Sequence, residues 1–188
     1  MNISVISAQN ILPLALENLE LVFVNYTNNS STSPQEAFKA RNSGVEMASN
    51  EVVTFFDSQD SWSLQHVDLI EEHFSADVDF LLLTPKGLPL PYSVEKLLKY
   101  FANGEACPTG NIVARKQVFK KLNGFNATLP HSASWEFILR ALLDKSISVR
   151  VVNEASWVYK YNPLSIANTR LPSHQEVIAW RRQWAQNI

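Results

Sequence analysis

Short apolar runs alternate with longer amphipathic stretches along the chain. The apolar runs have the length and the β-branched or aromatic content of strands, and they cover residues 3–7, 19–25, 51–56, 78–83, 111–114, 147–152 and 155–159. The stretches between them have helical spacing, and they cover residues 33–49, 64–74, 93–103, 115–122, 134–144 and 173–187. Strands that alternate with helices predict an α/β fold built on a mainly parallel sheet.

Capping residues mark the starts of two of these helices. Ser33 is expected to be an N-cap, with Pro34 at the first helical position and Glu36 completing a capping box. Ser173 and Glu176 repeat the same signature before the last helix. The sequence therefore predicts that each helix begins at its box.

The first half of the chain carries two further local signals. Ser63 is expected to cap the helix at 64–74, whose inward face would hold Leu64, Val67, Ile70 and Phe74. The first crossover is short, because only residues 8–18 separate the first two strands. A parallel crossover needs about a dozen residues or more. Either the helix there is stunted, or the two strands are not joined by a full βαβ unit.

The composition is that of a globular protein, with 188 residues of which 46% are hydrophobic and 18% are charged. These values exclude an intrinsically disordered chain, and the single cysteine, Cys107, excludes a disulfide framework or a Cys-rich zinc site. No apolar run approaches the roughly 18 residues of a membrane helix, and the N-terminal residues lack the pattern of a signal peptide. We therefore expect one cytoplasmic domain over residues 1–188, with the helix at 173–187 packed on it.

The net charge of −2 conceals an uneven distribution. Residues 1–94 contain 3 Lys and Arg against 12 Asp and Glu, whereas residues 95–188 contain 13 against 6. The basic half could meet an anionic partner such as a diphosphate, a lipid headgroup or nucleic acid. The alternative is a polarised surface with no specific partner.

An acidic cluster, Asp57-Ser58-Gln59-Asp60, follows the strand at 51–56 directly. Ligands of open α/β sheets bind at the carboxyl ends of the strands. Two carboxylates three residues apart in a turn can face one hard cation such as Mg²⁺ or Mn²⁺, whose other ligands would be water and phosphate oxygens. The alternative is a solvated turn, since Asp and Ser are common turn residues.

The cluster belongs to a longer series of motifs. It is preceded by Ala40-Arg41-Asn42-Ser43-Gly44-Val45 and Ala48, and it is followed by Trp62. Downstream lie Gly110-Asn111-Ile112-Val113-Ala114-Arg115-Lys116, Phe119, Gly124-Phe125-Asn126, Leu129-Pro130 and Trp135-Glu136-Phe137-Ile138-Leu139-Arg140. In order and spacing, over about residues 3–160, these motifs resemble the family 2 glycosyltransferases.

The resemblance implies a GT-A fold with a mixed, mainly parallel sheet. It also implies a nucleotide-diphosphate sugar as donor, a saccharide acceptor, Mn²⁺ or Mg²⁺ as cofactor, and transfer with inversion. The metal would be bound by Asp57, Gln59 and Asp60, and the donor by Ser7, Ala8, Gln9, Asn25, Arg41 and Asp57. Arg41 would lie near the donor phosphates, because a guanidinium suits a bidentate anion contact. Its alternative is a surface arginine paired with Glu36 or Glu46.

The chain departs from the family pattern at three functional positions. Gln59 replaces the second carboxylate of the D-x-D motif, and Asn25 stands where the family places an aspartate that holds the nucleoside. Ser134 stands where the family has its catalytic base. Serine alone cannot accept the proton of an acceptor hydroxyl at neutral pH. Ser132 or Ser134 is instead suited to cap the helix before Trp135.

Two nearby residues are candidates for the missing base. His131 titrates in the right range, and Glu136 lies in the first turn of the helix. Each has a structural alternative: a histidine beside a proline is often a loop residue, and a glutamate there complements the helix N-terminus.

The last helix contains Trp180-Arg181-Arg182-Gln183-Trp184, a basic and aromatic segment that could lie on a membrane surface. We favour packing of both tryptophans on the domain, because they have helical spacing, and we expect no nucleic-acid partner. Two hypotheses follow for the whole chain. It is either a glycosyltransferase with an atypical base or a non-catalytic relative that keeps the scaffold to bind a sugar or a partner.

Overall fold

The computed structural model describes residues 1–7, 17–24, 33–57, 60–105, 108–129, 131–160 and 174–186. Its centre is a six-stranded sheet in the order β2-β1-β3-β6-β5-β7. The strands are β1 (Ile3–Ser7), β2 (Leu19–Phe23), β3 (Val52–Phe56), β5 (Phe80–Leu83), β6 (Ile112–Arg115) and β7 (Val149–Val152). β6 pairs antiparallel with both of its neighbours, and the other pairs are parallel. The expected mixed, mainly parallel sheet is therefore confirmed.

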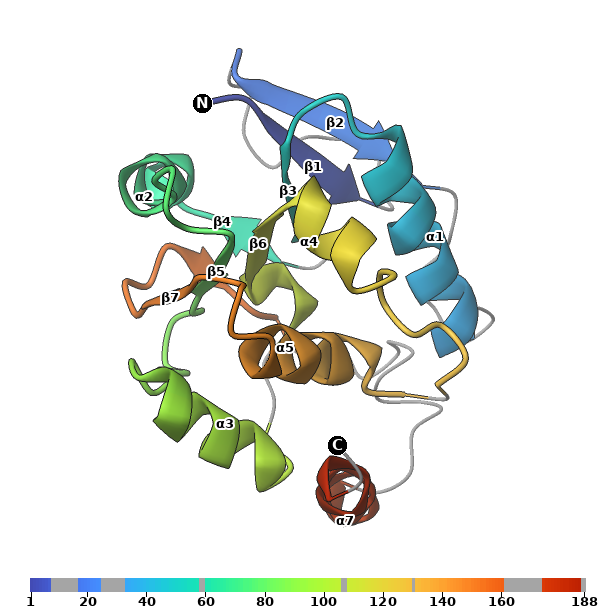
Figure 1. Cartoon of the computed structure of the whole chain (residues 1–188). Coiled ribbons are helices and arrows are strands. Elements are labelled where there is room, and N and C mark those ends of the chain that lie inside the picture. Colours follow the sequence, from blue (N-terminus) through green and yellow to red (C-terminus); the bar gives the residue numbers. More distant parts are fainter. Residues whose placement is uncertain are drawn as a thin grey trace.

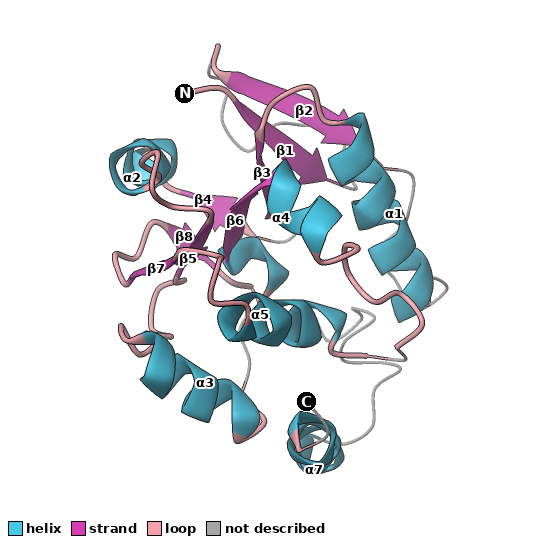
Figure 2. Cartoon of the chain, in the orientation of Figure 1, coloured by secondary structure: helices cyan, strands magenta, loops and turns pink. Residues whose placement is uncertain are grey.

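Helices cover both faces of the sheet (Figures 1 and 2). The helices are α1 (Pro34–Met47), α2 (Gln65–His73), α3 (Val94–Ala102), α4 (Lys116–Lys121), α5 (Ala133–Leu143) and α7 (His174–Ala185), with a short 3₁₀ turn, η1 (Thr109–Asn111). One apolar core joins α1, α4 and α5 to the face that carries Ile6, Phe55 and Phe80. A second core joins α2 to the opposite face, which carries Val5 and Leu81.

Helix α1 is capped and packed as its sequence predicts. The Ser33 hydroxyl accepts from the backbone N–H of Glu36, and the Glu36 carboxylate accepts from the backbone N–H of Ser33, so the capping box is confirmed. Gly44 brings the helix onto the sheet. A Cβ at this position would lie 2.6 Å from Ile6 Cγ2 and 2.8 Å from Val24 Cγ1. This close approach fixes the height of α1 above β1.

Several local expectations were wrong. Ser63 does not cap α2: the N-cap position is Leu64, without a side-chain hydrogen bond. Leu64 also points outward, at 80% exposure, whereas Val67, Ile70 and Phe74 are buried as expected. Ser132 does occupy the N-cap position of α5, as one of the two alternatives predicted, but it has a left-handed conformation and its hydroxyl makes no capping hydrogen bond. Its partners are described with the site below.

The structure adds a feature that the pattern did not predict, a small second sheet. β4 (Ser61–Trp62) pairs antiparallel with β8 (Trp157–Val158), so that Ser61 lies opposite Val158. β8 lies within the run predicted at 155–159, whereas the two residues of β4 are too few to show a periodicity. At the first crossover, β1 and β2 are parallel neighbours, while residues 8–16 lie outside the described residues.

Helix α7 packs on the domain through its aromatic residues. The Trp180 and Trp184 rings lie 6.2 and 5.6 Å from the ring of Trp135 on α5, both edge-on. Figure 1 shows α7 beside α3 and α5, with the C-terminus next to it. The packing interpretation of both tryptophans is confirmed, and Ser173 of the expected capping box lies outside the described residues. Within the described part of the chain, every helix is too short or too polar to span a bilayer.

Candidate functional site

The candidate site lies at the carboxyl ends of β1 and β3. The two strands run in parallel and in register, so that Ser7 pairs with Phe56 at the last position of each. Asp57 follows β3 directly and is partly exposed, while Ser7 is buried. Ligands of open α/β sheets bind at this edge, as the sequence predicted for the acidic cluster.

Arg41 of α1 reaches this edge and pairs with Asp57. Its Nη2 donates to Asp57 Oδ1 at 2.7 Å, and the two side chains are 9% and 25% exposed. The guanidinium also lies 5.0 Å from the ring centre of Phe38, one turn earlier on the helix. Because Gly44 sets α1 close to β1, Arg41 is held beside the end of the sheet. Two residues that the sequence assigned to the site are thus brought together.

Asp60 is the second carboxylate of the cluster and is only 8% exposed. Its backbone N–H donates to the Asp57 carbonyl at 2.9 Å, which keeps the two residues in one turn. Burial, together with repulsion from Asp57, raises the pKa of Asp60 to about 7, although Lys160 and Arg41 act in the opposite direction. Asp60 therefore changes its charge near neutral pH.

Two neighbours of Asp60 were not assigned to the site from the sequence. The backbone N–H of Lys160 donates to Asp60 Oδ1 at 3.3 Å. A Cβ on Gly110 would lie 3.5 Å from Asp60 Oδ2 and 3.1 Å from the buried ring of Trp157. Gly110 was available as part of a motif, but Lys160 had no sequence signal. It lies 100 residues from Asp60 and reaches it only through the pairing of β4 with β8.

The 3₁₀ turn beside the site contains an unsatisfied side chain. Asn111 is fully buried, and neither its Nδ2 nor its Oδ1 has a hydrogen-bond partner among the described residues. The turn leads into β6, where the Ile112 carbonyl accepts from the Thr54 hydroxyl of β3 at 3.0 Å. Buried amides without partners are uncommon and costly. Within the described part of the chain, Asn111 is therefore a polar side chain close to β3 whose hydrogen-bonding groups have no partner.

The described residues do not fit the divalent metal that the resemblance implies. Among them, no group of three or more His, Cys, Asp or Glu side chains could hold an ion. Asp57 has its charge offset by Arg41, and Asp60 is buried with Oδ1 accepting from Lys160. Mg²⁺ and Mn²⁺ are bound in proteins mainly through one or two carboxylates that are free to coordinate, with water and phosphate oxygens as the other ligands. Gln59, the third expected ligand, lies outside the described residues and would be a neutral one.

Other predicted donor contacts also fall outside the described residues. These are Ala8 and Gln9 after β1, and Asn25 after β2. Ser7 is described, at the end of β1, where its carbonyl accepts from the backbone N–H of Val24 at 2.9 Å.

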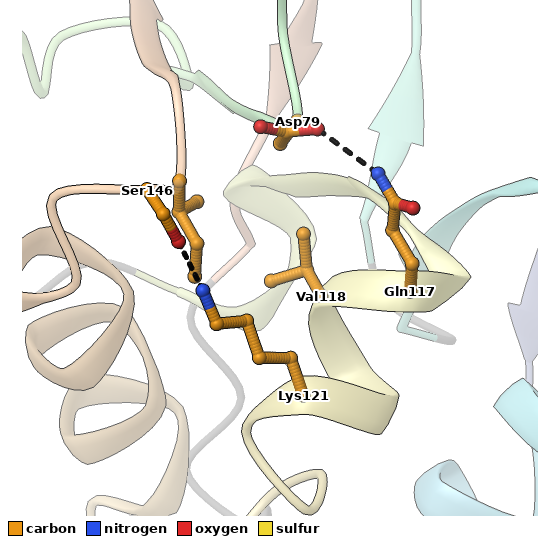
Figure 3. Close-up of a pocket in the computed structure, with 6 residues that line it drawn as sticks. Asp79, Gln117, Val118, Lys121 and Ser146 are labelled. Carbon is orange, nitrogen blue, oxygen red and sulfur yellow. Dashed lines mark hydrogen bonds between the residues drawn. The ribbon is translucent and has the colours of Figure 1, made fainter.

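Three surface hollows lie around α4, which follows β6 at the far end of β3 from Asp57. They have volumes of about 350, 500 and 640 Å³ and share Gln117 in their linings. Figure 3 shows the first, where Gln117 donates to Asp79 at 3.2 Å and Lys121 donates to Ser146. Asp79 immediately precedes β5, so this hollow is at the amino end of that strand. The polar groups of this first hollow bond to one another, and we assign it no part in the site.

The residues near the expected base have defined partners. Both oxygens of Glu136 accept from Arg140, at 2.5 and 2.8 Å. His131 Nδ1 lies 2.8 Å from the hydroxyl of Ser132, which accepts from Arg181 Nε of α7 at 2.9 Å. Burial, and to a lesser degree Arg181, lowers the pKa of His131, so its imidazole is neutral at physiological pH.

The motifs that were far apart in the sequence are joined by hydrogen bonds. The Asn42 side chain of α1 donates to the Phe125 carbonyl at 2.8 Å and accepts from its N–H at 2.9 Å. Arg140 of α5 donates to the carbonyls of Leu122 and Gly124. The turn after α4 is therefore held from both sides, and these motif residues support the scaffold.

The fold matches solved glycosyltransferase structures, whereas the sequence matches no protein-family profile and no curated protein. S. aureus TarS 1–349 in complex with UDP-GlcNAc has a TM-score of 0.56 at 17% identity, over 96% of this chain and 66% of that chain. Glucosyl-3-phosphoglycerate synthase from Mycobacterium tuberculosis, with Mn²⁺, UDP and glucosyl-3-phosphoglycerate, has a TM-score of 0.57 at 16% identity, over 97% and 76%.

A third similar structure is the mannosyltransferase PcManGT from Pyrobaculum calidifontis in complex with GDP-Man and Mn²⁺. Its TM-score is 0.56 at 11% identity, over 98% of this chain and 61% of that chain. The present chain thus spans slightly less than two thirds of the TarS fragment and of PcManGT. Together these likenesses show that the chain has the GT-A glycosyltransferase fold.

Proposed function

We propose that this protein binds a nucleotide-diphosphate sugar at the carboxyl edge of β1 and β3 and transfers the sugar to a hydroxyl of a saccharide acceptor. The observation that supports this most is the Arg41–Asp57 pair at that edge, in a fold shared with proteins solved with UDP-GlcNAc, UDP and GDP-Man. Fold alone does not establish an activity, and the paired residues at the strand ends supply the chemical argument.

The proposed reaction is a single displacement at the anomeric carbon. The acceptor oxygen forms a bond to this carbon while the bond to the diphosphate oxygen breaks, and the electron pair of that bond leaves with the nucleoside diphosphate. Negative charge therefore grows on the diphosphate in the transition state. A cation that is fixed before the reaction stabilises such charge without reorganisation. We assign this stabilisation to Arg41, whose guanidinium is oriented by its hydrogen bond to Asp57.

The acceptor proton must pass to a base, and we propose His131 for this role. Its imidazole is neutral at physiological pH because its pKa is lowered, as a general base requires. Glu136 has no part in the proposed step, because Arg140 occupies both of its oxygens. Ser134 remains in the first turn of α5 as a helix residue.

Binding is tested by calorimetric titration with UDP, GDP and their sugars in buffer that contains Mn²⁺. Arg41→Ala should raise the dissociation constant of whichever nucleotide binds by about 10-fold or more. This is the amount expected for the loss of a charge-assisted hydrogen bond. Lys39→Ala is the matched control, since Lys39 is an exposed cation on the same helix. Equal affinities of the two variants, or no binding to any nucleotide at millimolar concentration, would contradict the proposal.

A second candidate function is nucleotide-sugar binding without transfer. It is favoured by the base position, where Ser134 replaces the family carboxylate and the nearest glutamate is held by Arg140. The two candidates differ in turnover, which is measured by release of free UDP or GDP from the donor that binds. Transfer is supported if the protein turns over its donor and His131→Gln abolishes this turnover without changing the affinity for the donor. Absence of turnover with a broad panel of saccharide acceptors supports the binding role.

A further inference from the structure

Two basic residues border the acidic cluster. Arg41 lies on its α1 side, with Nη2 2.7 Å from Asp57 Oδ1. Lys160 lies on its β8 side, where its backbone N–H donates to Asp60 Oδ1 at 3.3 Å and its side chain is exposed. Both positive charges act to lower the pKa of the Asp60 carboxyl.

The position of Lys160 is fixed by strand pairing. Asp60 immediately precedes β4, and Lys160 follows β8 by two residues. Because β4 and β8 pair antiparallel with Ser61 opposite Val158, the chain beyond β8 passes beside Asp60, and the Lys160 backbone N–H donates to the Asp60 side chain. Trp157, at the start of β8, is buried and donates through Nε1 to the Leu83 carbonyl at 3.0 Å. This anchors β8 to the main sheet, and Lys160 with it.

The carboxylates of the cluster are already engaged by these groups. Asp57 is paired with Arg41, and Asp60 is buried and accepts from the Lys160 backbone N–H. Arg41 and Asp57 form an ion pair, so the exposed Lys160 adds a further positive charge on the β8 side of the cluster. A diphosphate carries at least two negative charges, and cationic side chains can stabilise them as a bound metal would.

We propose that Arg41 and Lys160 hold the donor diphosphate directly, so that the protein binds its donor without a divalent metal. This inference rests on the proposed function, because it concerns the same site. It also explains why Gln59 can replace the second carboxylate of the D-x-D motif. Where no metal has to be bound, a neutral residue at this position does not weaken donor binding. The lysine ammonium takes the place of the cation beside the phosphates.

The test compares nucleotide binding in EDTA with binding in Mn²⁺, using the nucleotide diphosphate that binds best. The dissociation constant should agree within about 3-fold between the two buffers. In EDTA, Lys160→Met should weaken binding at least 10-fold, and Lys160→Arg should restore most of it. Lys145→Met is the matched control, because Lys145 is exposed and lies before β7 at the opposite edge of the sheet. It should leave binding unchanged.

The outcomes separate the two proposals. Binding that appears in Mn²⁺ and is lost in EDTA would overturn the metal-independent site and leave the proposed function intact. Equal affinity of Lys160→Met and Lys145→Met would overturn the role of Lys160. No binding in either buffer would overturn both the inference and the proposed function. Circular dichroism of each variant shows whether a loss of binding reflects a loss of folding.

Discussion

Asp60 is the residue of the candidate site whose protonation the fold changes most. Its pKa rises from an ordinary value of 3.8 to about 7, so the folded protein holds this proton where the unfolded chain has released it. The free energy of unfolding should therefore fall as the pH rises from about 4 to about 7, by up to ~1.4 kcal/mol per pH unit for one proton. Asp60→Asn should remove this contribution.

The measurement is urea unfolding of both proteins at several pH values between 4 and 8. The difference in unfolding free energy between wild type and Asp60→Asn isolates this carboxyl from other titrating groups. As the pH rises to about 7, the wild type should lose stability relative to Asp60→Asn. Above that pH the difference in unfolding free energy should stay constant. A difference that stays constant with pH would show that Asp60 titrates normally.

Single residues also show what the sequence could and could not reveal of the site. Asp57 and Arg41 could be predicted, because a strand end and a helix motif place polar residues at one edge of the sheet. Lys160 could not, since its position depends on pairing between two short strands 100 residues apart. Glu136 has an ordinary helix-start sequence, and only the structure shows that Arg140 holds both of its oxygens.

At the scale of elements, the approach of α1 to the sheet is the most specific packing feature. Gly44→Ala would place a methyl group 2.6 Å from Ile6 Cγ2 and 2.8 Å from Val24 Cγ1. Overpacking of this kind costs about 1–3 kcal/mol, which should outweigh the helix propensity gained by replacing glycine. Ser43→Ala, at the exposed neighbouring position, should change stability little. Urea unfolding of the two variants measures the contrast, and equal stabilities would show that α1 can move away from the sheet.

The elements that could be predicted are those with a long pattern or a specific cap. The capping box located the start of α1, and the apolar runs located the strands of the main sheet. Strand direction has no such signal, so the antiparallel β6 did not emerge from the runs themselves. The prediction that Ser63 caps α2 failed because a serine before a helix need not occupy the N-cap position. Here Leu64 occupies it, and no side chain makes a capping hydrogen bond.

Across the whole molecule, long-range hydrogen bonds connect the segments that resemble the glycosyltransferases. Asn42 clamps Phe125, and Arg140 joins Glu136 to the turn at Gly124. These residues hold α1, α4 and α5 together around the first apolar core. The motif residues therefore have a structural role, which is why they predicted the fold. Solved structures with this fold are only 11–17% identical to the present chain. The chain departs from the pattern at Gln59 and Ser134. By resemblance these positions serve metal binding and proton transfer, and they do not hold the fold together.

Helix α7 extends this connection to the proposed base. Arg181 donates to the Ser132 hydroxyl at 2.9 Å and to the Gly104 carbonyl at 3.0 Å, and its charge helps to lower the pKa of His131. Arg181→Ala should therefore raise the pKa of His131 toward the ordinary value of a histidine. Arg182→Ala is the control, because Arg182 donates instead to the Asn103 carbonyl.

The pKa is measured by an NMR titration of the histidine C–H signals, with the His131 signal assigned by its loss in His131→Gln. A higher pKa would leave a smaller fraction of His131 neutral near pH 6, because protonation removes the lone pair that accepts the acceptor proton. Turnover, where present, should then fall more steeply on acidification in Arg181→Ala than in Arg182→Ala. An unchanged His131 pKa in Arg181→Ala would show that α7 packs on the domain without acting on the base.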